Sequence, residues 1–123
     1  MSEAPKTIFI DIDGTIFKHA GNSSVVSSYT PELLPGVKEK FVEWDKRGYT
    51  IIITTGRRKN LLPITHRQLT DAGLFFDELI MGLPRGKRVV INDVKPGREP
   101  ESAATGINVE RDHGLENIDV RRS

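Results

Sequence analysis

The spacing of apolar and polar positions changes along this chain, and the changes predict its elements. Residues 6–10 (KTIFI) form a short apolar run without polar alternation, which is typical of a strand covered on both faces. Residues 49–54 (YTIIIT) give the strongest strand signal, because five of the six side chains are β-branched. Further strands are predicted at 77–81 and 88–91, and a last short one at 106–109.

Two helices are predicted between these strands. Ahead of Gly48, apolar side chains recur at spacings of three, four and three residues, which places them on one face of a helix. These residues are Leu34, Val37, Phe41 and Trp44. Because Trp44 lies on this stripe, it is interpreted as a core residue. The second helix begins near Pro63 and ends at Gly73. The residues expected to face the sheet are Leu62, Leu69 and Ala72.

The alternation of strands and helices predicts an α/β protein with a central parallel sheet covered on both faces. With 123 residues, the sequence is expected to form one domain, 1–123. Residues 18–31 are rich in Ser, Asn, Gly and Lys and are predicted to form a flap or loop. Residues 95–102 are predicted to be a polar loop. The tail 111–123 is expected to fray, apart from a turn near 115–120.

Composition narrows the classes of function. The 18 Lys and Arg residues nearly balance 17 Asp and Glu residues, so no general attraction to nucleic acid or to a membrane is expected. The sequence has no Cys, which excludes disulfides, thiolate zinc sites and a cysteine nucleophile. It contains neither an apolar run long enough to span a membrane nor an apolar signal core at its start, so a cytoplasmic location is expected.

Polar residues gather where the predicted strands end. In parallel sheets, ligands bind beyond the carboxyl ends of the strands. Two carboxylates about 4 Å apart repel each other by about 4 kcal/mol at an effective dielectric constant of 20, so a cluster of them indicates either a raised pKa or a bound cation. Mg²⁺, which prefers oxygen ligands, suits such a cluster. The polar strand ends carry Asp11 and Asp13, Thr54 and Thr55, and Asn92 and Asp93.

Two other metal sites fit the sequence poorly. A calcium-binding EF-hand that began at Asp11 would need Gly and Glu where Ile16 and Asn22 stand. Zinc is disfavoured because the histidines are scattered without a His-x-x-x-His pair. They are His19, His66 and His113.

The same residues suggest chemistry on a phosphate ester. Asp11 could be a nucleophile that forms an aspartyl phosphate, and Asp13 could protonate the leaving group and then deprotonate water. The Thr55 hydroxyl and the Gly56 amide could bind a phosphate oxygen, with Thr54 as the competitor of Thr55. The alternative for this Asp-x-Asp-Gly sequence is an ordinary turn that closes a strand.

Basic residues form two clusters that could neutralise a phosphate. Arg57, beside Gly56, and Arg85 are the candidates for binding substrate. Most of the others are expected to be solvated surface charges, and no interleaved aromatic residues suggest binding to single-stranded nucleic acid. The clusters are Arg57, Arg58, Lys59 and Arg67, and Arg85, Lys87 and Arg88.

Over residues 6–96 the sequence resembles the haloacid dehalogenase (HAD) superfamily of phosphotransferases. The resemblance rests on IFIDIDGTIF (8–17), IIITTGR (51–57) and VVINDVKP (89–96), which follow the family's order. FFDELIMGLP (75–84) also looks like small members without a cap domain that are linked to carbohydrate biosynthesis. The resemblance implies a Rossmann-like three-layer sandwich and Mg²⁺-dependent hydrolysis of a phosphate monoester.

Positions that match the family's motifs take their roles from the resemblance. Asp11 would be the nucleophile and a metal ligand. Asp13 would be the general acid and base and would lend its backbone carbonyl to the metal. Thr55 would bind the phosphoryl group, and Asp93 would complete the metal site. Asn92 stands where many members have a second acid, and it would hold a metal-bound water.

One position departs from the family's pattern. Leu83 stands where many members have a lysine, just before Pro84. Lys87 is the nearest lysine and is assigned the missing charge, with Arg85 and Arg88 as its rivals. The alternative is a weak or inactive protein that only binds a phosphorylated ligand or partner.

The segment between the first motif and the next helix is too short for a cap domain. Water exclusion would then depend on the 18–31 flap or on a neighbouring subunit of a homo-oligomer. An open site is consistent with a phosphorylated sugar or a polymer end as substrate. A receiver domain of two-component signalling is disfavoured, since the strand end near mid-chain carries Thr54 and Thr55 and lacks an Asp.

Overall fold

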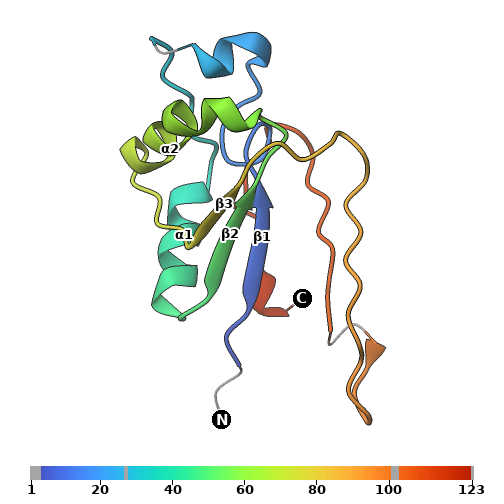
Figure 1. Ribbon diagram of the computed structural model, residues 1–123. Coiled ribbons are helices and arrows are strands. Elements are labelled where there is room, and N and C mark those ends of the chain that lie inside the picture. The colour runs from blue at the N-terminus through green and yellow to red at the C-terminus, as the bar shows by residue number, and fades with distance from the viewer. Residues whose placement is uncertain (1–3, 27, 101–102, 123) are drawn as a thin grey trace.

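The structure is a computed structural model that describes residues 4–26, 28–100 and 103–122. A parallel sheet with the strand order β1-β2-β3 forms its centre (Figure 1). The register pairs Asp11 with Thr54 at the carboxyl end of the first two strands. The three strands expected around these positions are therefore confirmed. They are β1 (Thr7–Asp11), β2 (Thr50–Thr54) and β3 (Glu78–Ile80).

Two α-helices connect these strands, as the apolar spacing predicted: α1 (Val37–Lys46) and α2 (Leu62–Asp71). Both connections step across the sheet in the same direction, so both helices lie on the same side of it (Figure 1). The expected α/β, Rossmann-like fold with a central parallel sheet is confirmed. The described structure also contains the short 3₁₀ helices η1 (Gly21–Val25), η2 (Lys59–Leu61) and η4 (Val120–Arg122).

The core lies between the two α-helices and the sheet. Trp44 is 2% exposed, and its ring centre lies 5.4 Å from that of Phe41, which confirms its interpretation as a core residue. Leu69 of α2 is fully buried, but Leu62 is 44% exposed, so its expected contact with the sheet is wrong. Leu62 occupies the first position of α2, where the helix has only begun to approach the sheet.

The opposite face of the sheet is open. Ile8 and Ile10 of β1 turn toward the core, whereas Phe9 between them is 59% exposed. Ile80 of β3 is 43% exposed. Within the described ranges, no α-helix covers this face, so the third layer of the expected sandwich is not seen there (Figure 1).

Residues 84–100, called the arm below, depart most from the sequence prediction. Every residue from Pro84 to Pro100 is exposed, and the expected strand at 88–91 does not form. The expected strand at 106–109 is also absent from the structure. Both segments have strand-forming side chains but no neighbouring strand to bond to, and an unpaired strand is not stable by itself.

The tail was expected to fray, but its described residues pack against the rest of the chain. Leu115 is 3% exposed, and its backbone N–H donates to the carbonyl of Pro35 at 2.8 Å. Gly114 touches the same proline closely enough that a side chain would clash with the backbone there. The tail therefore packs against the start of α1. None of the described helices has the length and apolar character needed to cross a membrane.

Candidate active site

The carboxyl ends of the three strands bring predicted site residues together. Asp11 and Thr54 end neighbouring strands in register. Thr55 follows directly, and its backbone N–H donates to the carbonyl of Ile80 at 2.9 Å. The carbonyl of Thr55 in turn accepts a bond of 3.0 Å from the N–H of Leu83. Backbone hydrogen bonds thus fix Asp11, Thr54 and Thr55 relative to one another and to the end of β3.

A tight turn follows β1 and sets the position of Asp13. The carbonyl of Ile12 accepts the N–H of Ile16 at 2.8 Å, and the N–H of Gly14 donates to Phe17 at 2.7 Å. Gly14 has a φ of 91°, a conformation that side-chain-bearing residues rarely adopt. Because the chain turns here, Asp13 leaves the line of the strand and need not share the face of Asp11.

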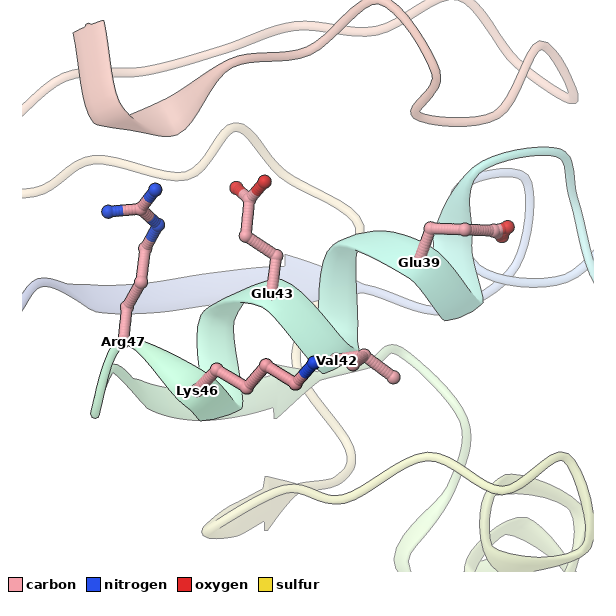
Figure 2. Close-up of a pocket in the computed structure, with 5 residues that line it drawn as sticks. All are labelled: Glu39, Val42, Glu43, Lys46 and Arg47. Atoms are coloured by element: carbon pink, nitrogen blue, oxygen red, sulfur yellow. The ribbon is translucent and has the colours of Figure 1, made fainter.

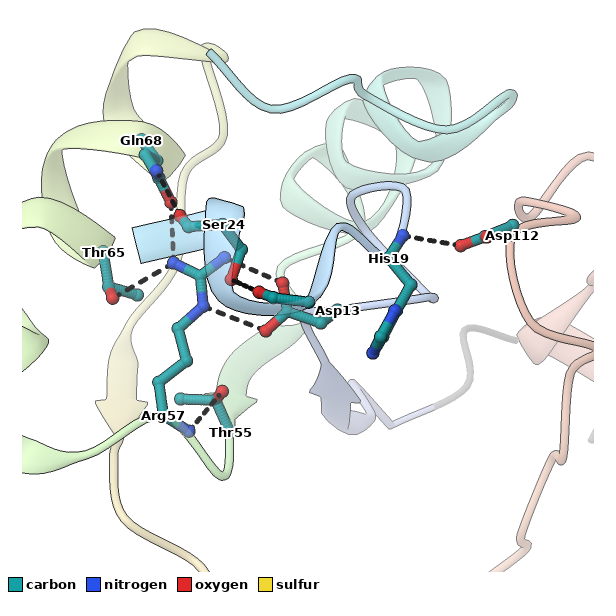
Figure 3. A network of polar contacts seen from close by, with 9 residues as sticks. Asp13, His19, Ser24, Thr55, Arg57, Thr65, Gln68 and Asp112 are labelled. Carbon is teal, nitrogen blue, oxygen red and sulfur yellow. Dashed lines mark hydrogen bonds and ion pairs between the residues drawn. The ribbon is translucent and has the colours of Figure 1, made fainter. Parts of the chain in front are cut away.

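Asp13 forms a two-pronged ion pair with Arg57 (Figure 3). The Nε of Arg57 donates to Oδ2 of Asp13 at 2.9 Å, and its Nη2 donates to Oδ1 at 2.8 Å. The Arg57 side chain is only 4% exposed, against 24% for Asp13. Arg57 was expected to bind substrate, but in this structure its guanidinium holds the proposed acid and base.

The remaining donors of Arg57 bind α2. Its Nη1 donates to Oγ1 of Thr65 at 3.2 Å and to Oε1 of Gln68 at 2.6 Å. Gln68 donates from Nε2 to the carbonyl of Ser24 at 2.8 Å (Figure 3). Ser24 belongs to η1, within the segment predicted to be a flap. A continuous chain of hydrogen bonds therefore connects this flap to Asp13 through Gln68 and Arg57.

Thr55 and Gly56 lie beside this network. Thr55 is 1% exposed, and its Oγ1 accepts the backbone N–H of Arg57 at 3.1 Å (Figure 3). That bond uses the hydroxyl as an acceptor and leaves its proton for another partner. A Cβ on Gly56 would lie 3.3 Å from the carbonyl of Leu83, so glycine suits the close approach of these two segments.

The electrostatic environment of Asp11 raises the pKa of its carboxyl group. Asp11 remains open to solvent as a residue, but its surroundings remove part of the hydration of its carboxyl group, which raises the pKa of Asp11 above its usual 3.8, and the negative charge of Asp13 raises it further. A backbone hydrogen bond from Ile12 and the positive charges of Arg88 and Arg57 act in the opposite direction. A group that neutralises this corner of the site would therefore favour the charged Asp11 that a nucleophile requires.

Three basic residues were candidates for the missing lysine charge. Of these, Arg88 is the one whose positive charge lowers the pKa of Asp11 in the described part of the chain. Its Nη1 donates to the carbonyls of Pro84 at 2.9 Å and Gly86 at 2.8 Å, which holds its guanidinium close to its own segment. Lys87 and Arg85 are exposed on the same arm. The assignment to Lys87 or Arg85 stays a prediction.

Asn92 and Asp93 lie on the exposed arm. In the residues that the structure describes, no group of three or more His, Asp or Glu side chains is placed to hold a metal ion. A ligand set of Asp11, Asp13 and Asp93 is therefore not gathered in this conformation of a single chain. Its assembly stays a prediction.

Sequence reasoning missed several residues that support the site. Thr65 and Gln68 are 0% and 5% exposed on the same helix face as Leu69, and two polar residues on a buried face indicate a buried polar partner. For Asp112 of the tail, the sequence contains no comparable indication of a role at the site. Asp112 nevertheless donates its N–H to the carbonyl of Gly14 at 2.8 Å, and its Oδ1 accepts the N–H of His19 at 2.7 Å (Figure 3).

A surface hollow lies elsewhere, over the outer side of α1 (Figure 2). Its lining includes none of the predicted site residues. One helix supplies every lining side chain, and Figure 2 shows them directed outward from it. The hollow is therefore not the candidate site. It is lined by Glu39, Val42, Glu43, Lys46 and Arg47.

Comparison with known sequences gives one partial match. No family model matches the sequence. The uncharacterized protein MJ0015 of Methanocaldococcus jannaschii is 40% identical over 53 residues, which cover 43% of this chain and 54% of that protein. The chain thus spans about half the length of the curated relative that it matches.

Two solved structures resemble most of this chain in fold. A chain of the Pnkp1/Rnl/Hen1 complex superposes with a TM-score of 0.54 at 24% identity, over 80% of this chain and 31% of that chain. A protein from Vibrio cholerae superposes with a TM-score of 0.53 at 21% identity, over 79% of this chain and 92% of its own length. At these identities, the comparisons show a shared fold.

Proposed function

We propose that this chain is a phosphatase of the HAD superfamily that hydrolyses a phosphate monoester through an aspartyl-phosphate intermediate. The observation that supports this most is the joint placement of Asp11, Thr55 and the Asp13–Arg57 pair around the carboxyl ends of parallel strands. Two of the motifs quoted above, at residues 8–17 and 51–57, contain these four residues and follow the order that the family shows.

The proposed reaction uses Asp11 first. A carboxylate oxygen of Asp11 attacks phosphorus, the bond to the leaving oxygen breaks, and Asp13 gives that oxygen a proton. Asp13 then takes a proton from water, which attacks the aspartyl phosphate and releases inorganic phosphate. The Thr55 hydroxyl donates to a phosphate oxygen, and the charge of Arg88 offsets the negative charge that gathers near Asp11.

Mg²⁺ is the proposed cofactor. Mg²⁺ is usually bound by one or two carboxylates together with water and substrate phosphate, and Asp11 offers a carboxylate of this kind. The ion would lower the cost of bringing a phosphate next to Asp11 and Asp13. The described residues of one chain provide only part of the ligand set for Mg²⁺, since Asp93 lies on the exposed arm.

We further propose a phosphorylated sugar as the substrate class and a capless architecture. Asp11 is exposed, and the described residues between β1 and α1 form turns, isolated β-bridges and η1. A bulky ester could therefore approach the site directly.

The decisive experiment measures hydrolysis of a generic aryl phosphate and of a panel of sugar phosphates, with and without Mg²⁺. Uncatalysed hydrolysis of phosphate monoesters is among the slowest reactions known, so even weak turnover is detectable. Asp11→Asn should reduce turnover by a factor on the order of 10³ or more, because it removes the nucleophile. Asp71→Asn, at an exposed acid on α2, should leave turnover unchanged. Turnover that survives Asp11→Asn would exclude the proposed mechanism.

A second candidate is a module that binds a phosphorylated ligand or partner without hydrolysing it. It is favoured by the state of Asp13, whose two carboxylate oxygens both accept bonds from Arg57. Asp13 must give up or share one of these bonds before it can transfer a proton. Calorimetric binding of inorganic phosphate in the absence of any turnover would support this candidate over the phosphatase.

A further inference from the structure

Gln68 of α2 is a buried polar residue to which the proposed reaction gives no role of its own. It is 5% exposed, and a buried amide is costly unless its oxygen and its nitrogen both find partners. Its Oε1 accepts a bond of 2.6 Å from Nη1 of Arg57, and its Nε2 donates to the carbonyl of Ser24 at 2.8 Å (Figure 3). Both ends of the amide are therefore in use.

The chemistry of these two partners fixes the orientation of the amide. A guanidinium can only donate hydrogen bonds, and a backbone carbonyl can only accept them. If the amide of Gln68 turned over, its nitrogen would face Arg57 and its oxygen would face the carbonyl of Ser24, and both bonds would be lost. The position of the Ser24 carbonyl therefore decides whether Gln68 presents its oxygen to Arg57.

Arg57 extends this orientation to Asp13. The guanidinium binds Gln68 through Nη1, and it binds Asp13 through Nε and Nη2 at 2.9 and 2.8 Å. The bond to Gln68, at 2.6 Å, is shorter than either bond to Asp13. Because a guanidinium is planar and rigid, a bond at one of its corners restricts the rotation of the edge that faces the carboxylate. The orientation of Asp13 therefore depends on Gln68.

The flap presents its carbonyl to Gln68 from a hydrogen-bonded turn. Ser24 of η1 is 7% exposed, and its Oγ donates to the carbonyl of Gly21 at 2.8 Å. The N–H of Val26 donates to the carbonyl of Ser23 at 3.1 Å. A displacement of this turn from α2 would carry the Ser24 carbonyl away from Gln68 and leave the amide nitrogen without this acceptor.

We propose that Gln68 is a positioning residue that aligns Asp13 through Arg57 when the flap is seated on α2. This inference rests on the proposed phosphatase function, in which Asp13 gives a proton to the leaving oxygen. The seated flap keeps the oxygen of Gln68 toward Arg57, and Arg57 then holds the carboxylate of Asp13 in one orientation. Displacement of the flap releases the amide and with it the guanidinium, so proton donation is tied to a closed site.

The first test measures how firmly the flap is held, and it needs no turnover. Amide hydrogen exchange is followed by NMR at Ser23 and Val26, whose N–H groups are hydrogen-bonded within the flap. Gln68→Glu keeps an oxygen acceptor for Arg57, but its ionised carboxylate has no donor for the flap carbonyl. Both amides should exchange about tenfold faster in this variant, as expected for one lost hydrogen bond. Thr70→Ala, at an exposed position of the same helix, should exchange like wild type. Wild-type exchange in Gln68→Glu would overturn the proposal.

The second test asks whether the coupling reaches Asp13. A coupling between two sites acts in both directions, so a change at Asp13 should loosen the flap. Asp13→Asn removes the charge that Arg57 binds, and it should speed exchange of the same two amides by a smaller factor than Gln68→Glu does. Asp11→Asn removes a charge from the same end of β1 and should leave them unchanged. Flap exchange that does not respond to Asp13→Asn would show that the coupling ends at Arg57, against the proposal.

The third test separates alignment of the acid from a general loss of structure. Nitrophenyl phosphate has a leaving group that departs without a proton, whereas a sugar phosphate needs the proton from Asp13. Gln68→Met is similar in size but has no amide. It should lower kcat/KM on the order of 10²-fold for the sugar phosphate that wild type hydrolyses fastest, and by less than about threefold for nitrophenyl phosphate. Equal losses for the two esters would mean a structural role alone and would contradict the proposal.

Failure of this inference can be told apart from failure of the proposed function. A wild-type chain that hydrolyses neither ester contradicts the phosphatase, while the exchange measurements still decide whether the flap and Asp13 are coupled. A chain that hydrolyses both esters but has wild-type flap exchange in Gln68→Glu keeps the phosphatase and excludes the coupling. Circular dichroism checks the folding of each variant. Where Gln68→Met does not fold, Gln68→Glu takes its place in the kinetic comparison, because it retains the bond to Arg57.

Discussion

Arg57 and Arg88 both act on the candidate site, but they belong to regions of opposite character. Arg57 is buried, and its guanidinium binds Asp13, Thr65 and Gln68. Arg88 is exposed and bonds only to carbonyls of its own arm among the hydrogen bonds of the described residues. The comparison shows that one half of the site is fixed by tertiary packing, whereas the other half is positioned locally on a segment that the rest of the chain does not cover.

The largest expected difference between the packed region and the arm is in stability. Phe41→Ala should lower the free energy of unfolding by about 3–5 kcal/mol, because it leaves a cavity beside Trp44. Val90→Ala, measured by urea unfolding at a dilution where the chain is monomeric, should change it by less than about 0.5 kcal/mol. Equal losses for the two variants would mean that the arm packs as tightly as the core.

The Arg57 network gives a smaller and more local effect. Arg57→Ala should destabilise the fold by about 2–3 kcal/mol, since it leaves Asp13 and Gln68 without their charged donor. Arg57→Lys should recover only part of this loss, because an ammonium cannot form the two-pronged pair. Arg58→Ala, at the exposed neighbour, is the control and should have almost no effect on the unfolding midpoint. A similar loss for the two alanine variants would contradict a special role for Arg57.

The smallest expected effect concerns the pH dependence of stability. The raised pKa of Asp11 means that the folded chain binds this proton more tightly than the unfolded chain does. Wild-type stability therefore falls as pH rises from about 3.8 through the raised value, and the loss persists at neutral pH. In EDTA, Asp11→Asn should melt at a higher temperature than wild type at pH 7, with a difference that shrinks in acid. A lower melting temperature for Asp11→Asn at pH 7 would show that the folded chain favours the charged form of Asp11.

The residues that the sequence identified best are those whose role depends on local pattern. The stripe that contains Phe41 and Trp44 specifies a helix face, and the run that ends at Asp11 specifies a strand, because each is a property of neighbouring positions. The strand expected at 88–91 has an equally clear pattern, but a strand also needs a partner, and the pattern says nothing about whether one is available. The same reasoning explains the fraying wrongly expected of the tail, whose Leu115 is buried by residues distant in sequence.

The candidate site was predictable in its residue types but not in its contacts. Asp11, Asp13 and Thr55 follow β-branched runs, so their convergence follows from the parallel order of strands. The partner of Arg57 could not be read from the sequence, because the ion pair joins residues 44 positions apart. The choice among the basic residues of the arm depended on the path of the arm itself, which the sequence does not determine.

The buried position of Trp44 has a practical consequence. Trp44 is the sole tryptophan of the sequence, and it is packed beside Phe41 at a distance from solvent. Its fluorescence should therefore be blue-shifted in the native protein and should report on the opening of the helix-to-sheet core. Movements of the exposed segment would leave this emission unchanged, so a spectroscopic label placed there would report on a separate event.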